Sequence, residues 1–347
     1  MITIEGRDVG AGSPPFIIAE LSGNHGGSLE MTLELVDAAA AAGADAVKLQ
    51  TYTADTMTLD VDADDFRVTD PTSPWANSTL YELYGQASTP WEWHEPLFER
   101  VRSHGLIPFS SPFDATAVDL LEDLGVPCYK IASFENVDLP LIRRVARTGK
   151  PLIISTGMAT LAEIDQAVTA AREAGCTDLI LLKCTSTYPA PPEHANLATI
   201  PAMAEAFSCD VGLSDHTLGI GVSLAAVALG AVAIEKHLTI RRSDGMVDGS
   251  FSMEPHEFRL LVDESFRAWQ GVGKVFFGPS DADRASLKYR RSLYVVNDLD
   301  AGATLGPEDV RAIRPGYGLP PVFHDDVIGR RLVRSVTRGT PVAWDLF

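Results

Sequence analysis

The sequence has few cysteines and no long apolar run, and each shortage excludes a class of protein. Four cysteines in 347 residues show neither paired metal-ligand spacing nor the dense framework of a small secreted protein, so we expect reduced, mostly buried thiols. No apolar run approaches the roughly 18 residues of a membrane-spanning helix, and the N-terminal residues lack the pattern of a signal peptide. We therefore expect a cytoplasmic protein that has no membrane partner.

Positive charge is also scarce, because 28 lysines and arginines stand against 47 aspartates and glutamates, for a formal net charge of -19. Nucleic acids and anionic membranes attract proteins through a positive field, so a surface of this charge is expected to bind neither. An anionic ligand would need a local positive pocket. Four of the seven lysines lie inside apolar runs, where a solvated lysine is not expected: Lys48, Lys130, Lys183 and Lys236.

What the sequence does contain is an alternation of strand-like and helix-like segments. The strand-like apolar runs are residues 16–21, 46–51, 106–111, 128–133, 152–156, 179–185, 211–216 and 231–237. Most are followed by a segment with helical spacing that ends at a glycine. Continuous apolar strands alternating with helices are typical of parallel pairing, and eight such units predict an α/β fold, a closed (β/α)8 TIM barrel.

In a barrel of this kind the chemistry lies at the carboxyl ends of the strands, where the loops converge on one mouth. The apolar runs of this chain end in polar side chains, for example Ser214, Asp215 and His216 after one strand and Glu235, Lys236 and His237 after the next. A single polar residue at a strand end can simply bond loop backbone. Polar groups at all eight strand ends instead predict one shared site.

Two further segments interrupt this pattern. The connection from about residue 52 to residue 90 is long, and long loops are often functional lids, so we predict a lid over the mouth. After the barrel the pattern changes to short β-like pieces broken by glycine and proline. We predict a catalytic barrel over residues 1–277, a linker over 278–291 and a small, mostly β domain over 292–347.

His216 and His237 are candidate metal ligands, because they would project from neighbouring strands into the same mouth. Imidazole suits Mn, Zn, Fe or Co, and a site with few protein ligands leaves positions for water and substrate. A general base or a structural histidine is the alternative for each.

Cationic and hydroxyl side chains at other strand ends suit a small, multiply charged anion such as a molecule with both a phosphate and a carboxylate. The candidates are Lys48, Lys130, Ser133, Ser155 and Ser214. Three carboxylates near the same rim could orient a sugar or move a proton: Glu20, Glu135 and Asp248. Each could equally be a helix cap or a loop anchor.

At this point a series of motifs resembles a known family. In chain order they are IAELSGNHGGS, GADAVKLQTYTADTMTLD, FSSPFD, YKIASFE, ISTGMAT, LLKCTSTYPAPP, GLSDHTLG, EKHLT and IRPGYGL. Together they resemble the sialic acid synthase family of phosphoenolpyruvate-condensing barrels, and AELSGNH, KLQTYTADT and TSTYPAPP are most similar to its pseudaminic acid synthase branch. The resemblance covers nearly the whole chain.

The resemblance implies a barrel followed by a small antifreeze-like (SAF) domain, in a swapped homodimer whose SAF domain covers the partner's mouth. It implies a divalent metal on His216 and His237, expected to be Mn²⁺, with Mg²⁺, Co²⁺ or Zn²⁺ as alternatives. The implied phosphoenolpyruvate contacts are Lys48, Ser111, Lys130, Ser133, Ser155 and Ser214. The implied sugar contacts are Glu20, Gln50, Tyr188, Asp248 and Arg314, with Glu135 beside the reacting carbons.

The implied reaction joins phosphoenolpyruvate to an open-chain acetamido sugar, releases phosphate by C–O cleavage and forms a nine-carbon 2-keto acid. The expected acceptor is 2,4-diacetamido-2,4,6-trideoxyaltrose, which gives pseudaminic acid. Its legionaminic counterpart and N-acetylmannosamine remain alternatives. More distant alternatives are a metal-dependent sugar isomerase or hydrolase and a non-catalytic sugar-binding protein.

Overall fold

A computed structural model describes residues 1–70, 75, 76 and 78–347 of the chain. The chain forms two compact units, Met1–Gly273 and Lys274–Phe347. The segment expected to be a linker, 278–291, lies in the second unit and contains the 3-10 helix η7 (Arg284–Tyr289). No helix in the described part of the chain is long and apolar enough to cross a membrane.

The first unit is the predicted closed barrel of eight parallel strands, in the order β10-β3-β4-β5-β6-β7-β8-β9. Its strands are β3 (Phe16–Glu20), β4 (Ala46–Thr51), β5 (Ile107–Pro112), β6 (Tyr129–Ile131), β7 (Leu152–Ser155), β8 (Leu179–Cys184), β9 (Asp210–Ser214) and β10 (Ala233–His237). Each strand coincides, to within two residues at either end, with a run that the sequence marks as a strand. Because β6 ends at Ile131, Ser133 lies in the turn that follows. The expectation of a TIM barrel is confirmed.

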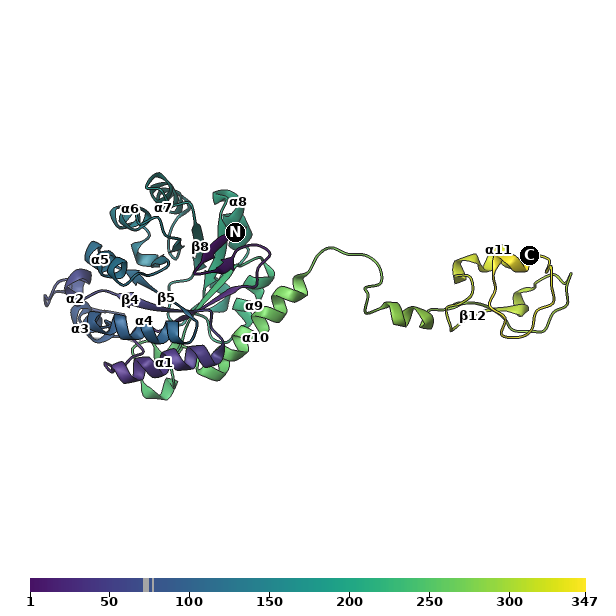
Figure 1. Ribbon diagram of the computed structural model, residues 1–347, viewed down its shortest axis with the longest axis horizontal. Helices are drawn as coiled ribbons and strands as arrows, with labels where there is room; N and C mark the ends of the chain where they lie inside the picture. Colours follow the sequence, from purple (N-terminus) through teal and green to yellow (C-terminus); the bar gives the residue numbers. More distant parts are fainter. Residues whose placement is uncertain (71–74, 77) are drawn as a thin grey trace. The chain divides into compact units, whose positions relative to one another are not determined.

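Helices surround the strands (Figure 1). They are α1 (Leu29–Ala42), α4 (His94–Ser103), α5 (Ala115–Asp123), α6 (Leu139–Ala146), α7 (Leu161–Glu173), α8 (Thr199–Phe207), α9 (Gly221–Ala228) and α10 (Pro255–Val272). Local sequence fixes their ends: the Ser28 hydroxyl accepts a hydrogen bond from the Met31 amide at the start of α1, and Gly43 ends that helix with a φ of 84°. Leu35 and Val36 turn the apolar face of α1 towards the strands.

The interior of the barrel is apolar at one end. The hairpin β1 (Ile2–Ile4) and β2 (Arg7–Val9) contributes three apolar side chains to a buried cluster with the first inward-facing residues of the strands. That cluster consists of Ile2, Ile4, Val9, Phe16, Ile18, Ala46, Ile107, Phe109, Cys128, Ile153, Ile180, Leu182, Val232 and Ala233. Because side chains on one face recur every second residue, the next inward positions on these strands lie nearer the other end, and those positions carry the polar groups.

The long connection after β4 contains α2 (Ala54–Met57), the 3-10 turn η1 (Asp64–Phe66), α3 (Leu80–Ala87) and the 3-10 turn η2 (Trp91–Trp93). The expected lid includes residues 71–74 and 77, which lie outside the described residues. The described part contributes side chains to the wall of a cavity at the barrel mouth.

The second unit has its own small core. Two antiparallel strands, β11 (Ser292–Val295) and β12 (Val310–Ile313), pair over four residues, and the rest is turns and short helices, including α11 (His324–Val327). Leu293, Val310 and Val342 are among the residues of its buried apolar cluster. This is the small β-containing domain that the glycine- and proline-rich sequence predicts.

Candidate functional site

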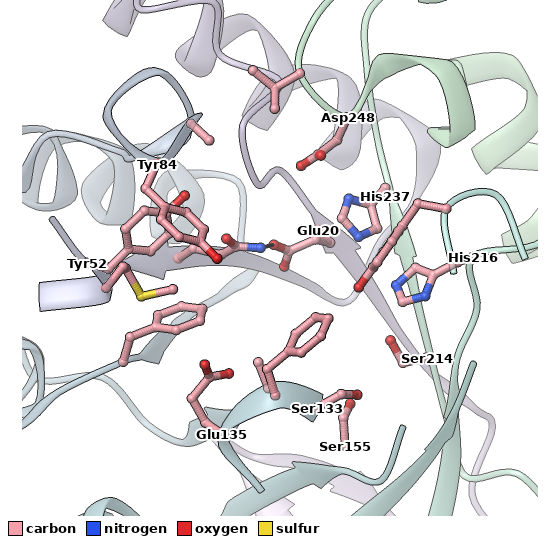
Figure 2. Close-up of a pocket in the computed structure, with 18 of the residues that line it drawn as sticks. Glu20, Tyr52, Tyr84, Ser133, Glu135, Ser155, Ser214, His216, His237 and Asp248 are labelled. Atoms are coloured by element: carbon pink, nitrogen blue, oxygen red, sulfur yellow. Dashed lines mark hydrogen bonds between the residues drawn. The ribbon is translucent and has the colours of Figure 1, made fainter. Parts of the chain in front are cut away.

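A cavity of about 290 Å³ opens at the carboxyl ends of the barrel strands (Figure 2). It is lined by all but two of the residues that the sequence suggests for the site. Those that line it are Glu20, Lys48, Gln50, Lys130, Ser133, Glu135, Ser155, Tyr188, Ser214, His216, His237 and Asp248. Of the other two, Ser111 is buried with its hydroxyl 3.4 Å from the Lys48 Nζ, and Arg314 is exposed in the second unit.

Two buried lysines meet two buried carboxylates on the floor of this cavity. The Lys48 Nζ lies 2.5 Å from the Glu20 Oε2 and 3.7 Å from the Glu235 Oε1, and the Lys130 Nζ lies 3.5 Å from the same Glu235 oxygen. The Gln50 amide donates to the Glu20 Oε1 at 2.9 Å. Two ammonium groups and two carboxylates cancel in formal charge, so the four can be buried together without isolated charge.

The pKa values of this cluster reflect burial and mutual attraction. Burial raises the pKa of Glu20, and Lys48 opposes that rise. Burial would also raise the pKa of Glu235, but Lys130 and Lys48 outweigh it and hold that pKa below its usual value. Burial lowers the pKa of Lys130, against the attraction of Glu235. An anion that enters the cavity therefore meets two lysines already held in place by carboxylates.

Hydroxyl groups and a close-fitting glycine form the adjacent wall. The Ser155 Oγ is buried and, within the described residues, has no hydrogen-bond partner, whereas the Ser133 Oγ accepts from the Gly157 amide at 3.2 Å. A side chain at Gly157 would place its Cβ 2.7 Å from the Ser133 Oγ and would also collide with the Ser186 hydroxyl. A buried hydroxyl without a partner is costly unless a ligand completes it, so this wall is suited to receive an acceptor-rich group such as phosphate.

The two histidines lie next to each other in the wall of the cavity, with ring centroids 5.3 Å apart. The His216 Nδ1 lies 2.9 Å from the Thr185 carbonyl oxygen, and because a carbonyl can only accept a hydrogen bond, the Nδ1 carries a proton. In the neutral ring the Nε2 then has its lone pair available. The His237 Nδ1 bonds the Ser22 hydroxyl at 3.0 Å. Burial, with His216 and nearby lysines, lowers the pKa of His237 well below its usual value and favours the neutral ring.

These features fit a divalent metal ion. Metal-binding imidazoles normally bind the ion through one nitrogen and are fixed by a hydrogen bond from the other nitrogen to an oxygen. Here the Nδ1 of each ring bonds an oxygen, so the Nε2 of each ring is the nitrogen that could bind an ion. Among the residues that the structure describes, no group of three His, Cys, Asp or Glu side chains is arranged to hold a metal. Two protein ligands would leave several coordination positions for water and substrate.

Residues 35–276 match the model of the NeuB family. The chain belongs to the NeuB family. Residues 290–347 match the SAF domain, so the second unit has the fold expected for this part of the chain. Both matches agree with the architecture of the two units described above.

Individual members of the NeuB family resemble the chain over nearly its full length. It is 43% identical to a pseudaminic acid synthase of Campylobacter jejuni, over 93% of this chain and 94% of that protein. It is 38% identical to an N,N'-diacetyllegionaminic acid synthase of Legionella pneumophila, over 95% and 94%. The crystal structure of an N-acetylneuraminic acid synthetase from Leptospira borgpetersenii matches with a TM-score of 0.73 at 32% identity, over 83% of this chain and 95% of that one.

Glu235 and Cys184 also line the cavity, but the sequence placed them only among the polar residues at strand ends and gave them no role in the site. Glu235 joins the lysine cluster, and Cys184 lies with its Sγ 3.8 Å from the His216 Nδ1. Burial would raise the pKa of Cys184, but His216 and its other neighbours outweigh it and lower that pKa to about 7. The two-residue period of a strand could have found Glu235, because it faces the same way as His237.

The same alternation turns Lys236 away from the cavity. Its Nζ lies 2.9 Å from the Asp215 Oδ2 and donates to the Thr217 carbonyl at 2.6 Å. Asp215 also accepts from the Ser223 hydroxyl at 2.6 Å and from the Thr217 amide at 2.9 Å. This outer cluster ties the residues beside the two histidines to each other and to α9.

Proposed function

We propose that this chain condenses phosphoenolpyruvate with the open-chain form of 2,4-diacetamido-2,4,6-trideoxyaltrose to give pseudaminic acid and phosphate. The observation that carries the proposal is that one cavity is lined by two buried lysines, by two imidazoles and by Ser155, whose hydroxyl has no hydrogen-bond partner among the described residues. The similarity to a pseudaminic acid synthase over most of both chains supports the acceptor. Because phosphoenolpyruvate is a metabolite of the cytoplasm, we place the reaction there.

The lysine and serine side of the cavity would bind phosphoenolpyruvate. Lys48 and Lys130 would supply positive charge, and Ser133, Ser155 and Ser214 would contact the ligand through their hydroxyls. The Ser214 hydroxyl donates to the Glu235 Oε1 at 3.0 Å in the structure and would exchange that bond for one to the ligand. Ser111 supports the Lys48 ammonium from behind rather than lining the cavity. Because these groups lie on the floor of a closed barrel, they are held rigidly enough to fix both ends of the enol ester.

The histidine side would hold a divalent metal through the Nε2 atoms of His216 and His237. We propose Mn²⁺, with Mg²⁺, Co²⁺ or Zn²⁺ as alternatives, because two imidazoles discriminate poorly between these ions. When bound, the metal supplies a Lewis acid beside the C1 aldehyde of the sugar. The Tyr188 ring lies 4.5 Å from the His216 ring between ring centroids, and Tyr188 would orient the sugar chain together with Gln50 and Asp248, which also line the cavity.

The reaction forms a C–C bond and a bond from C2 to a water oxygen, and it breaks the bond from C2 to the phosphate oxygen. The enol π electrons of phosphoenolpyruvate form a bond from its C3 to the sugar C1, and the C1 oxygen takes a proton. Water adds to C2 and passes one proton to a carboxylate, for which Glu135 and Glu20 are the candidates. The second proton is lost as the C2 hydroxyl becomes the keto group and the bond from C2 to the phosphate oxygen breaks, so that the two protons end on the C1 oxygen and on the released phosphate. Lys48 and Lys130 remain paired with the phosphate throughout and stabilise its charge as it leaves.

We further propose a homodimer in which the second unit of each copy covers the cavity of the other, so that Arg314 reaches the partner copy's sugar. The support is family membership, the SAF match and the exposure of Arg314. An Arg314→Ala variant should raise the KM for the sugar about tenfold and change the KM for phosphoenolpyruvate less than twofold. Equal changes in the two KM values, or a monomeric mass in solution, would count against this arrangement.

The proposed function is tested by incubating the protein with phosphoenolpyruvate and each of three sugars in the presence of Mn²⁺. These are 2,4-diacetamido-2,4,6-trideoxyaltrose, its legionaminic-type isomer and N-acetylmannosamine. Phosphate release should depend on both substrates and be fastest with the first sugar, with a product of the mass of pseudaminic acid. If none of the three sugars led to phosphate release, the proposed function would be refuted. A faster reaction with either of the other two sugars would refute the proposed acceptor.

A further inference from the structure

The described part of the long connection after β4 builds an apolar wall on one side of the cavity. Its members are Met57 at the end of α2, Val68, and Leu80 and Leu83 on α3. All four are partly buried, and all four line the cavity. We call these four side chains the apolar wall. In the same segment Leu59 is 62% exposed and does not line the cavity, so the segment is not apolar on every face.

Three aromatic side chains, Tyr52, Tyr84 and Phe113, line the same cavity as the apolar wall. The Tyr52 ring packs edge-to-face on Tyr84 at 5.8 Å and on Phe113 at 5.0 Å between ring centroids. Figure 2 places Tyr52 and Tyr84 across the cavity from His216 and His237. A sugar whose C1 lies beside the imidazoles therefore extends its far carbons towards this aromatic group and the apolar wall.

We infer that the apolar wall determines acceptor selectivity, by favouring sugars that present methyl groups from C4 to C6 over sugars that present hydroxyls there. This inference rests on the proposed function and names the side chains that choose its substrate. The favoured class carries an N-acetyl group at C4 and a methyl group as C6. N-acetylmannosamine has a hydroxyl at each of these positions.

The physical reason is the unequal cost of bringing these groups out of water. A methyl group gains on leaving water, whereas a hydroxyl placed against aliphatic side chains loses its water and gains no partner. Figure 2 places the hydroxyls of Tyr52 and Tyr84 and the Glu135 carboxylate on the side of the cavity away from the histidines, where they can bond the amide of a C4 acetamido group while its methyl contacts the apolar wall. Pockets of this kind discriminate by about 10- to 200-fold for one such group.

The test uses near-isosteric polar substitutions in the wall, Met57→Gln and Leu83→Asn, with Leu59→Asn as a matched control from the same segment. The measured quantity is kcat/KM at saturating phosphoenolpyruvate for the 2,4-diacetamido-2,4,6-trideoxy sugar and for N-acetylmannosamine. Wild-type protein should prefer the diacetamido sugar by at least about tenfold. Each wall variant should lower that preference about tenfold and leave the KM for phosphoenolpyruvate within twofold, while Leu59→Asn should change neither.

Two results separate failure of this inference from failure of the proposed function. An active wild-type protein whose acceptor preference is the same in both wall variants and in the control would overturn the role of the apolar wall alone. If the wild-type protein released no phosphate with any of the acetamido sugars, the proposed function would be overturned and this inference with it. Far-UV circular dichroism and thermal melts confirm folding, and Met57→Gln, at the end of a short helix, serves if Leu83→Asn does not fold.

Discussion

Two buried clusters of lysine and carboxylate lie on opposite sides of the barrel wall, and among the described residues only the outer one has every carboxylate oxygen hydrogen-bonded. In the outer cluster both oxygens of Asp215 accept hydrogen bonds, from Thr217, Ser223 and Lys236. In the inner cluster, within the described residues, the Glu235 Oε2 has no hydrogen-bond partner, and the nearby Ser155 Oγ has none either.

The difference separates a structural cluster from a binding one. Buried polar groups in native proteins are normally satisfied, so an incomplete cluster needs a reason such as a missing ligand. The complete outer cluster holds the backbone of the two histidine-bearing strand ends. The incomplete inner cluster leaves the Ser155 hydroxyl as a donor that an anionic substrate can use, and the Glu235 Oε2 as an acceptor for a hydroxyl or a water molecule. Substitutions in the outer cluster should therefore change mainly stability, and substitutions at the cavity should change mainly turnover.

The largest expected loss of stability comes from Lys236→Met. Removing the ammonium leaves the Asp215 carboxylate buried without its ion-pair partner, which costs about 3–5 kcal/mol of unfolding free energy. Urea denaturation followed by far-UV circular dichroism measures the change. An unfolding midpoint equal to that of the wild type would show that the outer cluster is not structural.

The neighbouring substitution, His237→Ala, should have the opposite profile. It removes a proposed metal ligand, so turnover should fall about a thousandfold, which corresponds to ~4 kcal/mol of transition-state stabilisation. The unfolding free energy should fall less than in Lys236→Met, by about 1–2 kcal/mol, because the lost contacts are the hydrogen bond to Ser22 and the ring contacts with His216 and Phe251 beside the cavity. Calorimetric titration with Mn²⁺ provides a second measurement, and unchanged Mn²⁺ affinity would remove His237 from the metal site.

A smaller effect, and the closest matched comparison, comes from the same change in each cluster. Ser223→Ala deletes a donor to Asp215 and should cost about 1.5–3 kcal/mol of unfolding free energy with little change in the KM for phosphoenolpyruvate. Ser155→Ala deletes an unpartnered hydroxyl, so stability should stay within about 0.5 kcal/mol while the KM for phosphoenolpyruvate rises at least tenfold. Equal stability losses in the two variants would contradict the distinction between the clusters.

The smallest expected effect concerns pH. Burial raises the pKa of Glu135 to about 7, and the attraction of Lys130 only partly offsets it. If its carboxylate takes the proton from water, kcat/KM should fall about tenfold per pH unit below pH 7. Glu135→Gln should be slower and should not show this fall in kcat/KM below pH 7. If the variant kept the wild-type pH profile, the fall would be due to another group.

The same raised pKa has a consequence for stability. The unfolded chain ionises Glu135 at its ordinary pKa of 4.5, whereas the folded protein keeps it protonated up to about pH 7. Between these values the unfolded state binds fewer protons, so the contribution of Glu135 to stability falls as pH rises. Glu135→Gln should lose less stability than the wild type between pH 4.5 and pH 7, as measured by urea denaturation at each pH.

The barrel and much of the cavity could be predicted from the sequence. Strands buried on both faces read as apolar runs, and each run here ends in polar residues that a barrel must bring together. That pattern alone placed Lys48, Lys130 and the two histidines near one another.

Other features depend on side-chain direction or on loop positions, which the sequence does not display. Lys183 and Lys236 lie in apolar runs like the other two lysines, but they alternate to the opposite side of their strands, where Lys183 bonds the Cys184 carbonyl and Lys236 bonds Asp215. The apolar wall comes from a segment without a regular pattern, so nothing in its spacing indicates which of its leucines lines the cavity and which faces solvent.

The most direct test of the proposed reaction uses phosphoenolpyruvate that carries ¹⁸O in the oxygen bridging C2 and phosphorus. The protein is incubated with Mn²⁺ and the 2,4-diacetamido-2,4,6-trideoxy sugar, and both products are analysed by mass spectrometry. We predict that the label appears in the released phosphate and that no phosphate forms without the sugar. Label retained in the keto acid, or phosphate released without the sugar, would contradict condensation by C–O cleavage in this cavity.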